Sequence, residues 1–173
     1  MPYRLEFDSW VPFPVEDVFL FLANPENLPL IMPPSTRTRI DELRLVPPEP
    51  RPGTALPART MLAGPSSEIV TSFSVLPNLP VRRRWISRIT EFEWNHHFAD
   101  IQVQGPFKGW AHRHELLPEM RNGVLGTVVR DEIQYEIGFG PLDGIVQGLF
   151  VGSRLRVTFA YRQEVLPGLI QRK

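Results

Sequence analysis

Proline is distributed so unevenly in this chain that it limits where long helices can form. Fifteen of the 19 prolines lie before residue 81. Because proline lacks an amide hydrogen and clashes with the preceding helical turn, long helices are not expected in that part. Near the C-terminus, Leu142–Leu166 contains no proline, and its apolar residues recur at three- and four-residue steps. This spacing predicts one long helix, ended by Pro167 and Gly168.

Alternating apolar and polar residues predict strands in much of the remaining sequence. A phase change at Asp41 and Glu42 predicts a bulge in the second strand. One short helix is expected at Pro14–Ala23 and another directly after it, where Pro29 would stop it. The predicted strands are Tyr3–Val11, Thr36–Val46, Glu68–Leu76, Val81–Phe92, Phe98–Gln104, Lys108–Leu117 and Gly126–Ile137.

Strands joined by short turns pair in antiparallel fashion, and a sheet with one polar face needs a cover for its apolar face. The long C-terminal helix is the element available as that cover. The expected fold class is therefore α+β, a curved antiparallel sheet around one helix with a cavity between them, in one domain spanning residues 1–173. The apolar residues that recur along the helix are Ile145, Val146, Leu149, Phe150, Val157 and Tyr161.

The composition excludes several classes of protein. Lys and Arg number 19, as do Asp and Glu, and this zero net charge argues against a nucleic-acid binder. The absence of cysteine excludes disulfides, thiol catalysis and thiolate metal sites. No integral membrane segment or signal peptide is recognisable, so a cytoplasmic location is expected. There is no phosphate-binding glycine loop, nucleophile elbow or His-Glu-x-x-His motif, and no cofactor is expected.

Two histidines in the strand predicted at Lys108–Leu117 are the strongest candidates for chemistry. Arg113 and Glu115 mark one face of this strand as the solvent side, so the other face should point inward. The residues expected on the inner face are Trp110, His112, His114 and Leu116.

The next strand, Gly126–Ile137, adds a carboxylate and a phenol to the same interior. Its charged residues share one face, which leaves Asp131 and Tyr135 on the inner face. An unpaired buried carboxylate is costly, so Asp131 is expected to contact His112 or His114.

The orientation of the preceding strand depends on the turn that begins at Gly105. If that turn brings Gln104 beside Gly109, Asp100 lies outside, opposite Arg113. The residues expected on the inner face are then Ala99, Ile101 and Val103.

Three interpretations of this inward-facing polar set remain open. It could be a buried hydrogen-bond network that fixes the strand register, or a polar cluster that lines a ligand pocket. A metal site is the third, with two imidazole nitrogens and one carboxylate oxygen as ligands, although nothing else in the sequence requires a metal.

Three further segments are unusual. Pro47–Pro65 holds six prolines and is expected to be a long loop. His96 and His97 lie at a break in the strand pattern and are expected at a turn or a pocket rim. Glycines recur every fourth residue near the C-terminal helix and should allow close packing on the sheet or form a smooth pocket wall. These glycines are Gly140, Gly144, Gly148 and Gly152.

The segments Pro14–Phe19 and Ala23–Pro29 resemble the opening of the START-like superfamily, also called the Bet v 1-like or SRPBCC (polyketide cyclase/dehydrase) group. A second set of residues resembles a bacterial ligand-binding branch of it. This set comprises Gly105, Pro106, Phe107, Trp110, His112, His114, Gly126, Thr127, Asp131, Tyr135, Gly140, Pro141 and Leu142. The resemblance covers nearly the whole chain and implies a helix-grip fold, but it carries over no catalytic residue.

Together these observations favour a protein that binds a small hydrophobic molecule with one polar end, such as a lipid, an isoprenoid quinone or a polyketide. His112, His114, Asp131 and Tyr135 would hold the polar end. The expected lining comprises Phe7, Ile69, Phe73, Val103, Trp110, Val129, Ile133, Gly148 and Gly152.

Two alternatives use the same residues differently or not at all. In a cyclase- or dehydratase-like enzyme, a histidine paired with Asp131 would be the general base, and Tyr135 would donate a hydrogen bond to a carbonyl. In a non-enzymatic interaction module, such as a homodimer, the proline-rich loop would make the contact.

Overall fold

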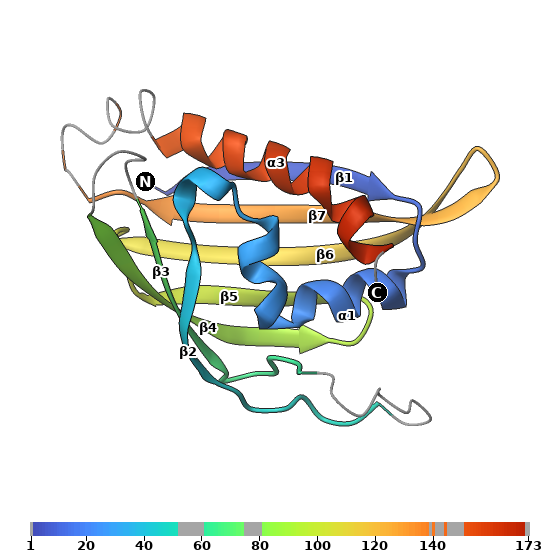
Figure 1. Ribbon diagram of the computed structural model, residues 1–173, viewed down its shortest axis with the longest axis horizontal. Coiled ribbons are helices and arrows are strands. Elements are labelled where there is room, and N and C mark those ends of the chain that lie inside the picture. The colour runs from blue at the N-terminus through green and yellow to red at the C-terminus, as the bar shows by residue number, and fades with distance from the viewer. Residues whose placement is uncertain are drawn as a thin grey trace.

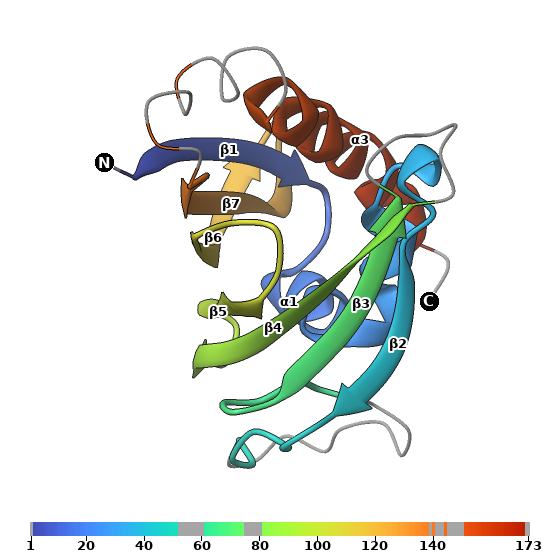
Figure 2. The same ribbon diagram turned by 90° about the vertical axis from the view of Figure 1, so that its left-hand side faces the viewer.

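One curved antiparallel sheet of seven strands organises the protein, in the order β1-β7-β6-β5-β4-β3-β2. The structure is a computed structural model, which describes residues 2–51, 61–74, 81–138, 140, 144 and 151–171. Figure 1 and Figure 2 show the sheet curving around α1, with α3 lying across its open side. This arrangement confirms the predicted α+β class and the helix-grip fold.

Each of the seven predicted strands is present. The bulge predicted at Asp41 is confirmed, because the pairing register between β2 and β3 shifts between Ile40 and Glu42. The strands are β1 (Tyr3–Val11), β2 (Arg39–Arg44), β3 (Glu68–Ser74), β4 (Arg82–Glu93), β5 (His97–Gln104), β6 (Gly109–Arg121) and β7 (Val124–Glu136). The helices are α1 (Val15–Ala23), the 3-10 helices η1 (Pro25–Ile31) and η2 (Pro34–Thr36), and α3 (Gly152–Ile170).

Two prolines do not end helices where the sequence predicted. Pro29 lies inside η1, and Pro167 lies inside α3, which continues to Ile170. Leu166 and Ile170 are buried in the core, so burial of these side chains outweighs the helical hydrogen bond that the proline removes. The Gln171 N–H donates to the Pro167 carbonyl, which completes the last turn. Most of the predicted start of this helix, residues 145–150, lies outside the described residues.

The core has two main parts, one on either side of the middle of α3. Beneath its C-terminal half, side chains of α1, the sheet and α3 pack together. They include Val18, Phe19, Phe98, Leu116, Val129, Leu166 and Ile170. Beneath its N-terminal half, Phe159 stacks on Phe7 of β1 with ring centroids 4.6 Å apart, beside Ile133 and Tyr135 of β7. None of the described helices combines the length and apolar character needed to cross a bilayer.

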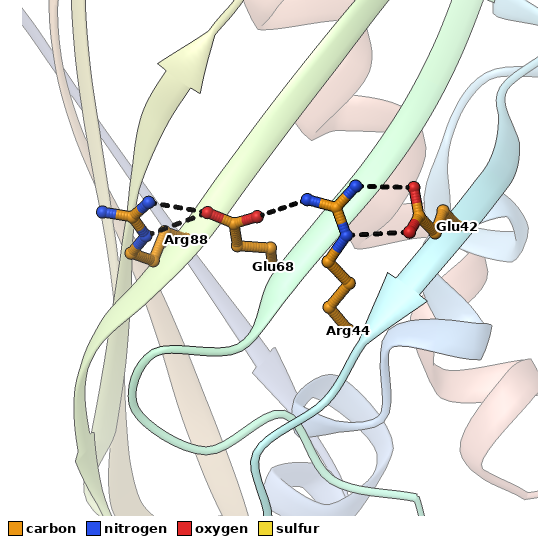
Figure 3. Close-up of polar contacts among 4 residues, drawn as sticks. All are labelled: Glu42, Arg44, Glu68 and Arg88. Atoms are coloured by element: carbon orange, nitrogen blue, oxygen red, sulfur yellow. Dashed lines mark hydrogen bonds and ion pairs between the residues drawn. The ribbon is translucent and has the colours of Figure 1, made fainter.

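The convex face of β2, β3 and β4 carries a chain of four alternating charges (Figure 3). Arg44 donates two hydrogen bonds to Glu42 and one to Glu68, and Glu68 also accepts two from Arg88. These arginine hydrogen bonds lower the pKa of both Glu42 and Glu68. Because β2 is an edge strand, its charged surface disfavours pairing with the sheet edge of another molecule.

Candidate functional site

A buried carboxylate, that of Asp131 in β7, lies at the centre of three basic side chains. Its Oδ1 accepts hydrogen bonds from His112 Nε2 at 3.0 Å and from Arg162 Nη1 at 3.1 Å. His114 Nδ1 lies 2.7 Å from the same oxygen, but its alignment is too poor for a full hydrogen bond, so we treat it as an electrostatic contact. Between 3% and 7% of each of these four residues is exposed. The predicted contact of Asp131 with a histidine is confirmed, and it involves both.

Strand register and one helix position bring together the polar cluster, which comprises Asp131, His112, His114 and Arg162. His114 of β6 lies directly opposite Asp131 of β7, and His112 follows on the same face of β6. Arg162 reaches the carboxylate from α3, with its guanidinium carbon 4.6 Å from the centre of the Phe159 ring. The polar cluster therefore joins the concave face of the sheet to the helix that covers it.

Asp100 of β5 also belongs to this cluster, contrary to the prediction that it faces solvent. It pairs with His112 across β5 and β6, one residue away from the expected partner Arg113. A slip of one residue moves every side chain of a strand to the opposite face. Asp100 therefore points inward, with Oδ2 3.7 Å from His112 Nδ1.

The same slip makes the prediction for Val103 wrong. Val103 and Ile101 lie on the convex face, 45% and 38% exposed, and Val103 cannot line an interior cavity. The cause lies in the turn after β5, where the Gln102 side chain donates to the Phe107 carbonyl at 2.7 Å and accepts from its N–H at 3.2 Å. This side-chain bridge closes the turn in a register that strand periodicity does not reveal.

Burial and mutual pairing shift the titration of the cluster. Burial acts to raise the pKa of Asp131, but Arg162 and the two histidines outweigh it and hold that pKa well below its usual range. Burial lowers the pKa of His112 and of His114, and it raises the pKa of Asp100. At neutral pH the cluster therefore contains an ionised Asp131–Arg162 pair and two neutral imidazoles.

The geometry favours a hydrogen-bond network over a metal site at this place. Asp100, His112 and His114 each offer an atom within 4.8 Å of the others, which is close enough for a shared ion. However, His112 Nε2 is already bonded to Asp131, and the Arg162 guanidinium already balances the Asp131 charge. A metal ion would have to displace or repel that guanidinium.

Four half-buried aromatic side chains form a second group on the concave face, which we call the aromatic cluster. Trp85 of β4 has its ring centroid 5.1 Å from Trp110, 5.7 Å from Phe107 and 6.1 Å from Phe73. Phe107 in turn stacks on Trp110 at 5.1 Å. All four keep part of their surface exposed, whereas Tyr135, which contacts Phe107 and Trp110, is 1% exposed.

The other predicted lining residues are placed as follows. Ile69, Val129, Ile133 and Gly152 are buried, Phe7 is half-buried, and Gly148 lies outside the described residues. Gly140 and Gly144 are exposed, and among the described residues, apart from chain neighbours, no atom lies within 4 Å of a Cβ built on either. These two glycines therefore do not make the close approach that their spacing predicted.

Two hollows among the described residues are large enough to consider as binding sites. One, of about 210 Å³, opens at the end of β6 and β7 and includes Trp110 and Tyr135 in its lining. The other, of about 360 Å³, lies between Trp94 and the proline-rich segment, beside Pro47 and Met61. The polar cluster lines neither of them.

Arg162 was not predicted from the sequence, because only apolar residues were expected in the buried stripe of the last helix. Val157, assigned to that stripe, is 60% exposed. The stripe that meets the core instead comprises Leu155, Phe159, Arg162, Leu166 and Ile170. The signal that could have revealed Arg162 is Asp131, since a buried carboxylate requires a cation nearby.

The strand order and the placement of the helices give the helix-grip fold that the sequence resemblance implied. The sequence itself matches no known protein family and no curated protein. Solved structures match over nearly the whole chain, which confirms the fold. At these levels of sequence identity the likeness establishes the fold and not the activity.

Three of these structures illustrate the range of the fold. TTHA0849 from Thermus thermophilus is 15% identical, with a TM-score of 0.65 and 98% of each chain covered. Norcoclaurine synthase from Thalictrum flavum, solved with dopamine and hydroxybenzaldehyde, is 12% identical, with a TM-score of 0.59, 96% of this chain and 87% of that chain covered. A START superfamily protein from Mycobacterium smegmatis is 11% identical, with a TM-score of 0.61, 98% of this chain and 97% of that chain covered.

Proposed function

We propose that this protein binds a small, largely apolar molecule between the concave face of the sheet and α3, a lipid, isoprenoid quinone or polyketide being the expected class. The aromatic cluster is the observation that carries this proposal. Phe73, Trp85, Phe107 and Trp110 form one contiguous group of rings that stays partly exposed on the concave face, and contiguous exposed apolar patches often mark ligand-binding grooves. An apolar ligand packed against these rings would complete their burial.

A polar group on the ligand has a place to bind. Arg162 Nε is buried and has no hydrogen-bond partner among the residues that the structure describes. An unmet buried N–H costs about 1 to 3 kcal/mol, so a carbonyl or hydroxyl oxygen brought by a ligand would be favoured there. The aromatic cluster leads to this position, because the Trp110 ring lies 6.2 Å from His112, which in turn lies 5.6 Å from Phe159 beside Arg162.

One structural neighbour supports the choice of ligand class. Norcoclaurine synthase was solved with dopamine and hydroxybenzaldehyde, both small aromatic molecules. A protein with a similar fold therefore binds rings with polar substituents.

The internal pairing of the polar cluster supports binding rather than acid–base catalysis. A general base must come within hydrogen-bond reach of its substrate. One ring nitrogen of each histidine, His112 Nε2 and His114 Nδ1, already lies against Asp131, whereas Arg162 Nε has no hydrogen-bond partner among the described residues. In the proposed function these residues hold α3 on the sheet and orient Arg162, rather than moving a proton.

The proposal is tested with 8-anilinonaphthalene-1-sulfonate, a fluorescent apolar probe, on the full chain. Substituting Trp85→Leu or Trp110→Leu should weaken probe binding about tenfold or more, because each removes a large ring from the cluster. The matched control is Trp10→Leu on the convex face, which should leave the affinity unchanged. Equal affinities in all four proteins would overturn the proposal. Independently of the probe, native mass spectrometry of purified protein would identify any resident molecule.

A further inference from the structure

The turn between β4 and β5 brings two adjacent histidines and a glutamate together at the surface. His96 Nδ1 and His97 Nδ1 lie 2.9 Å apart. Glu93 Oε2 lies 3.4 Å from each of these two nitrogens. Side chains of neighbouring strand residues normally point to opposite faces, so their convergence here is a product of the turn.

We propose that these three atoms bind a divalent transition metal ion, with zinc as the ion that best fits them. Imidazole nitrogen and carboxylate oxygen are both zinc ligands, with bonds of about 2.0 to 2.2 Å. With such bonds, neighbouring ligand atoms lie about 2.8 to 3.6 Å apart, from right-angled to tetrahedral coordination. The three observed separations, 2.9, 3.4 and 3.4 Å, match that triangle, so one ion can reach all three atoms.

The backbone of the turn holds this triangle in place. Asn95 adopts a left-handed conformation with φ 59°, and the His96 N–H donates to the Glu93 carbonyl at 3.1 Å. The His96 carbonyl accepts from Leu116 N–H of β6 at 2.7 Å. The turn is therefore fixed to the neighbouring strand, and the ligands need little reordering on binding.

A second carboxylate, that of Glu91, favours the tautomer of His97 that carries its proton on Nε2 and leaves Nδ1 free. Its other ring nitrogen, Nε2, lies 3.3 Å from Glu91 Oε2. Glu91 is itself held by an ion pair with Arg113 of β6. A metal-bound histidine typically donates its remaining N–H to a carboxylate in this way, which leaves the first nitrogen free to coordinate. This contact separates the site from a chance group of surface charges.

The exposure of the ligands gives an ion a route and room for further ligands. The side chains of His96 and Glu93 are 47% and 64% exposed, so an ion can enter from solvent and retain water molecules. The side chain of His97 is 13% exposed and forms the inner wall. This turn lies apart from the aromatic cluster, and the proposal does not depend on the proposed ligand-binding function.

Calorimetric titration of the full chain with zinc chloride tests the site. We expect one ion per chain, with binding weakened at least tenfold by His96→Ala or Glu93→Gln, since each removes a ligand. Glu91→Gln should weaken binding about tenfold through His97. The matched control Glu16→Gln, an exposed carboxylate on α1, should bind like the original chain.

Nitrogen NMR of the imidazole rings provides a readout that needs no substitution. Zinc should shift Nδ1 of both His96 and His97, while Nε2 of His97 keeps its proton. The chain has four histidines and no cysteine, so His112 and His114 are the competing nitrogen ligands. No zinc binding, or shifts confined to His112 and His114, would overturn the proposal.

Discussion

Arg162 of α3 and Asp131 of β7 form a buried ion pair, with Nη1 3.1 Å from Oδ1. The pair crosses from the covering helix to the sheet inside an otherwise apolar interface. Removing both charges from water is costly, so such a pair adds little net stability, and we expect it mainly to fix the position of the helix on the sheet. Two neutral histidines of β6, His112 and His114, contact the same carboxylate and link β6 to the pair.

Substitution of Arg162 by Met should destabilise the protein by about 3 to 5 kcal/mol, because it leaves the Asp131 carboxylate buried without its cation. Urea denaturation at pH 7.5 measures this loss. The double substitution of Arg162→Met and Asp131→Leu should recover much of it, since both charges are then absent.

Arg130→Met is the matched control for this loss. Arg130 donates two hydrogen bonds of 2.9 Å to Asp8, but this pair lies on the wet convex face. Its loss should be much smaller because water screens the pair. Equal losses from the two substitutions would show that burial is not the deciding factor.

Asp100 and Asp131 flank His112 on opposite sides, and the same substitution should affect them differently. Asp131→Asn should cost about 3 kcal/mol or more at pH 7.5, because it removes the partner of Arg162. Burial raises the pKa of Asp100, so its contribution to stability is complete at low pH and is lost as pH rises through its native pKa. Asp100→Asn removes that loss and should be neutral or stabilising at pH 8. Comparable losses in both variants, measured by urea denaturation, would contradict this assignment.

The buried histidines should make the protein sensitive to mild acid. Burial lowers the pKa of His112 and His114, so below about pH 6.5 the unfolded chain binds protons that the native protein does not. Their contribution to stability is therefore complete above about pH 6.5 and declines as pH falls toward the lowered native pKa. Each histidine that stays neutral adds a slope of up to about 1.4 kcal/mol per pH unit.

His114→Phe tests this slope. Its ring stacks on Phe98 with centroids 4.4 Å apart, so phenylalanine preserves the packing while removing the titrating group. The difference in unfolding free energy between pH 7.5 and pH 5.5 should be smaller in the variant. An unchanged difference would show that His114 contributes no acid sensitivity.

Two glycines with open space where an alanine methyl group would lie should respond oppositely to that substitution. Gly123 lies at the β6–β7 turn with φ 78°, which an alanine adopts at a cost of about 1 kcal/mol. Gly168 lies exposed inside α3, where alanine should stabilise by about 0.5 to 1 kcal/mol through helix propensity. Thermal unfolding of both variants should give midpoint shifts of opposite sign; shifts of the same sign would contradict the prediction.

Much of the fold could be read from local patterns. Alternation predicted all seven strands and placed His112, His114 and Asp131 on the inner face, because side-chain direction in a strand repeats every two residues. The bulge at Asp41 was predicted for the same reason, as a local change of phase. These features depend on residues close together in the sequence, so local patterns were enough to predict them.

Long-range contacts decided the rest. The direction of Asp100 and Val103 depended on a side-chain bridge from Gln102 to the backbone of Phe107, and a one-residue error there reversed the whole strand. The burial of Arg162 depended on Asp131, 31 residues away, which no helical periodicity can encode. The continuation of α3 past Pro167 likewise depended on core space for Ile170. Tertiary contacts set these positions, because packing and charge pairing between distant segments outweigh local preference.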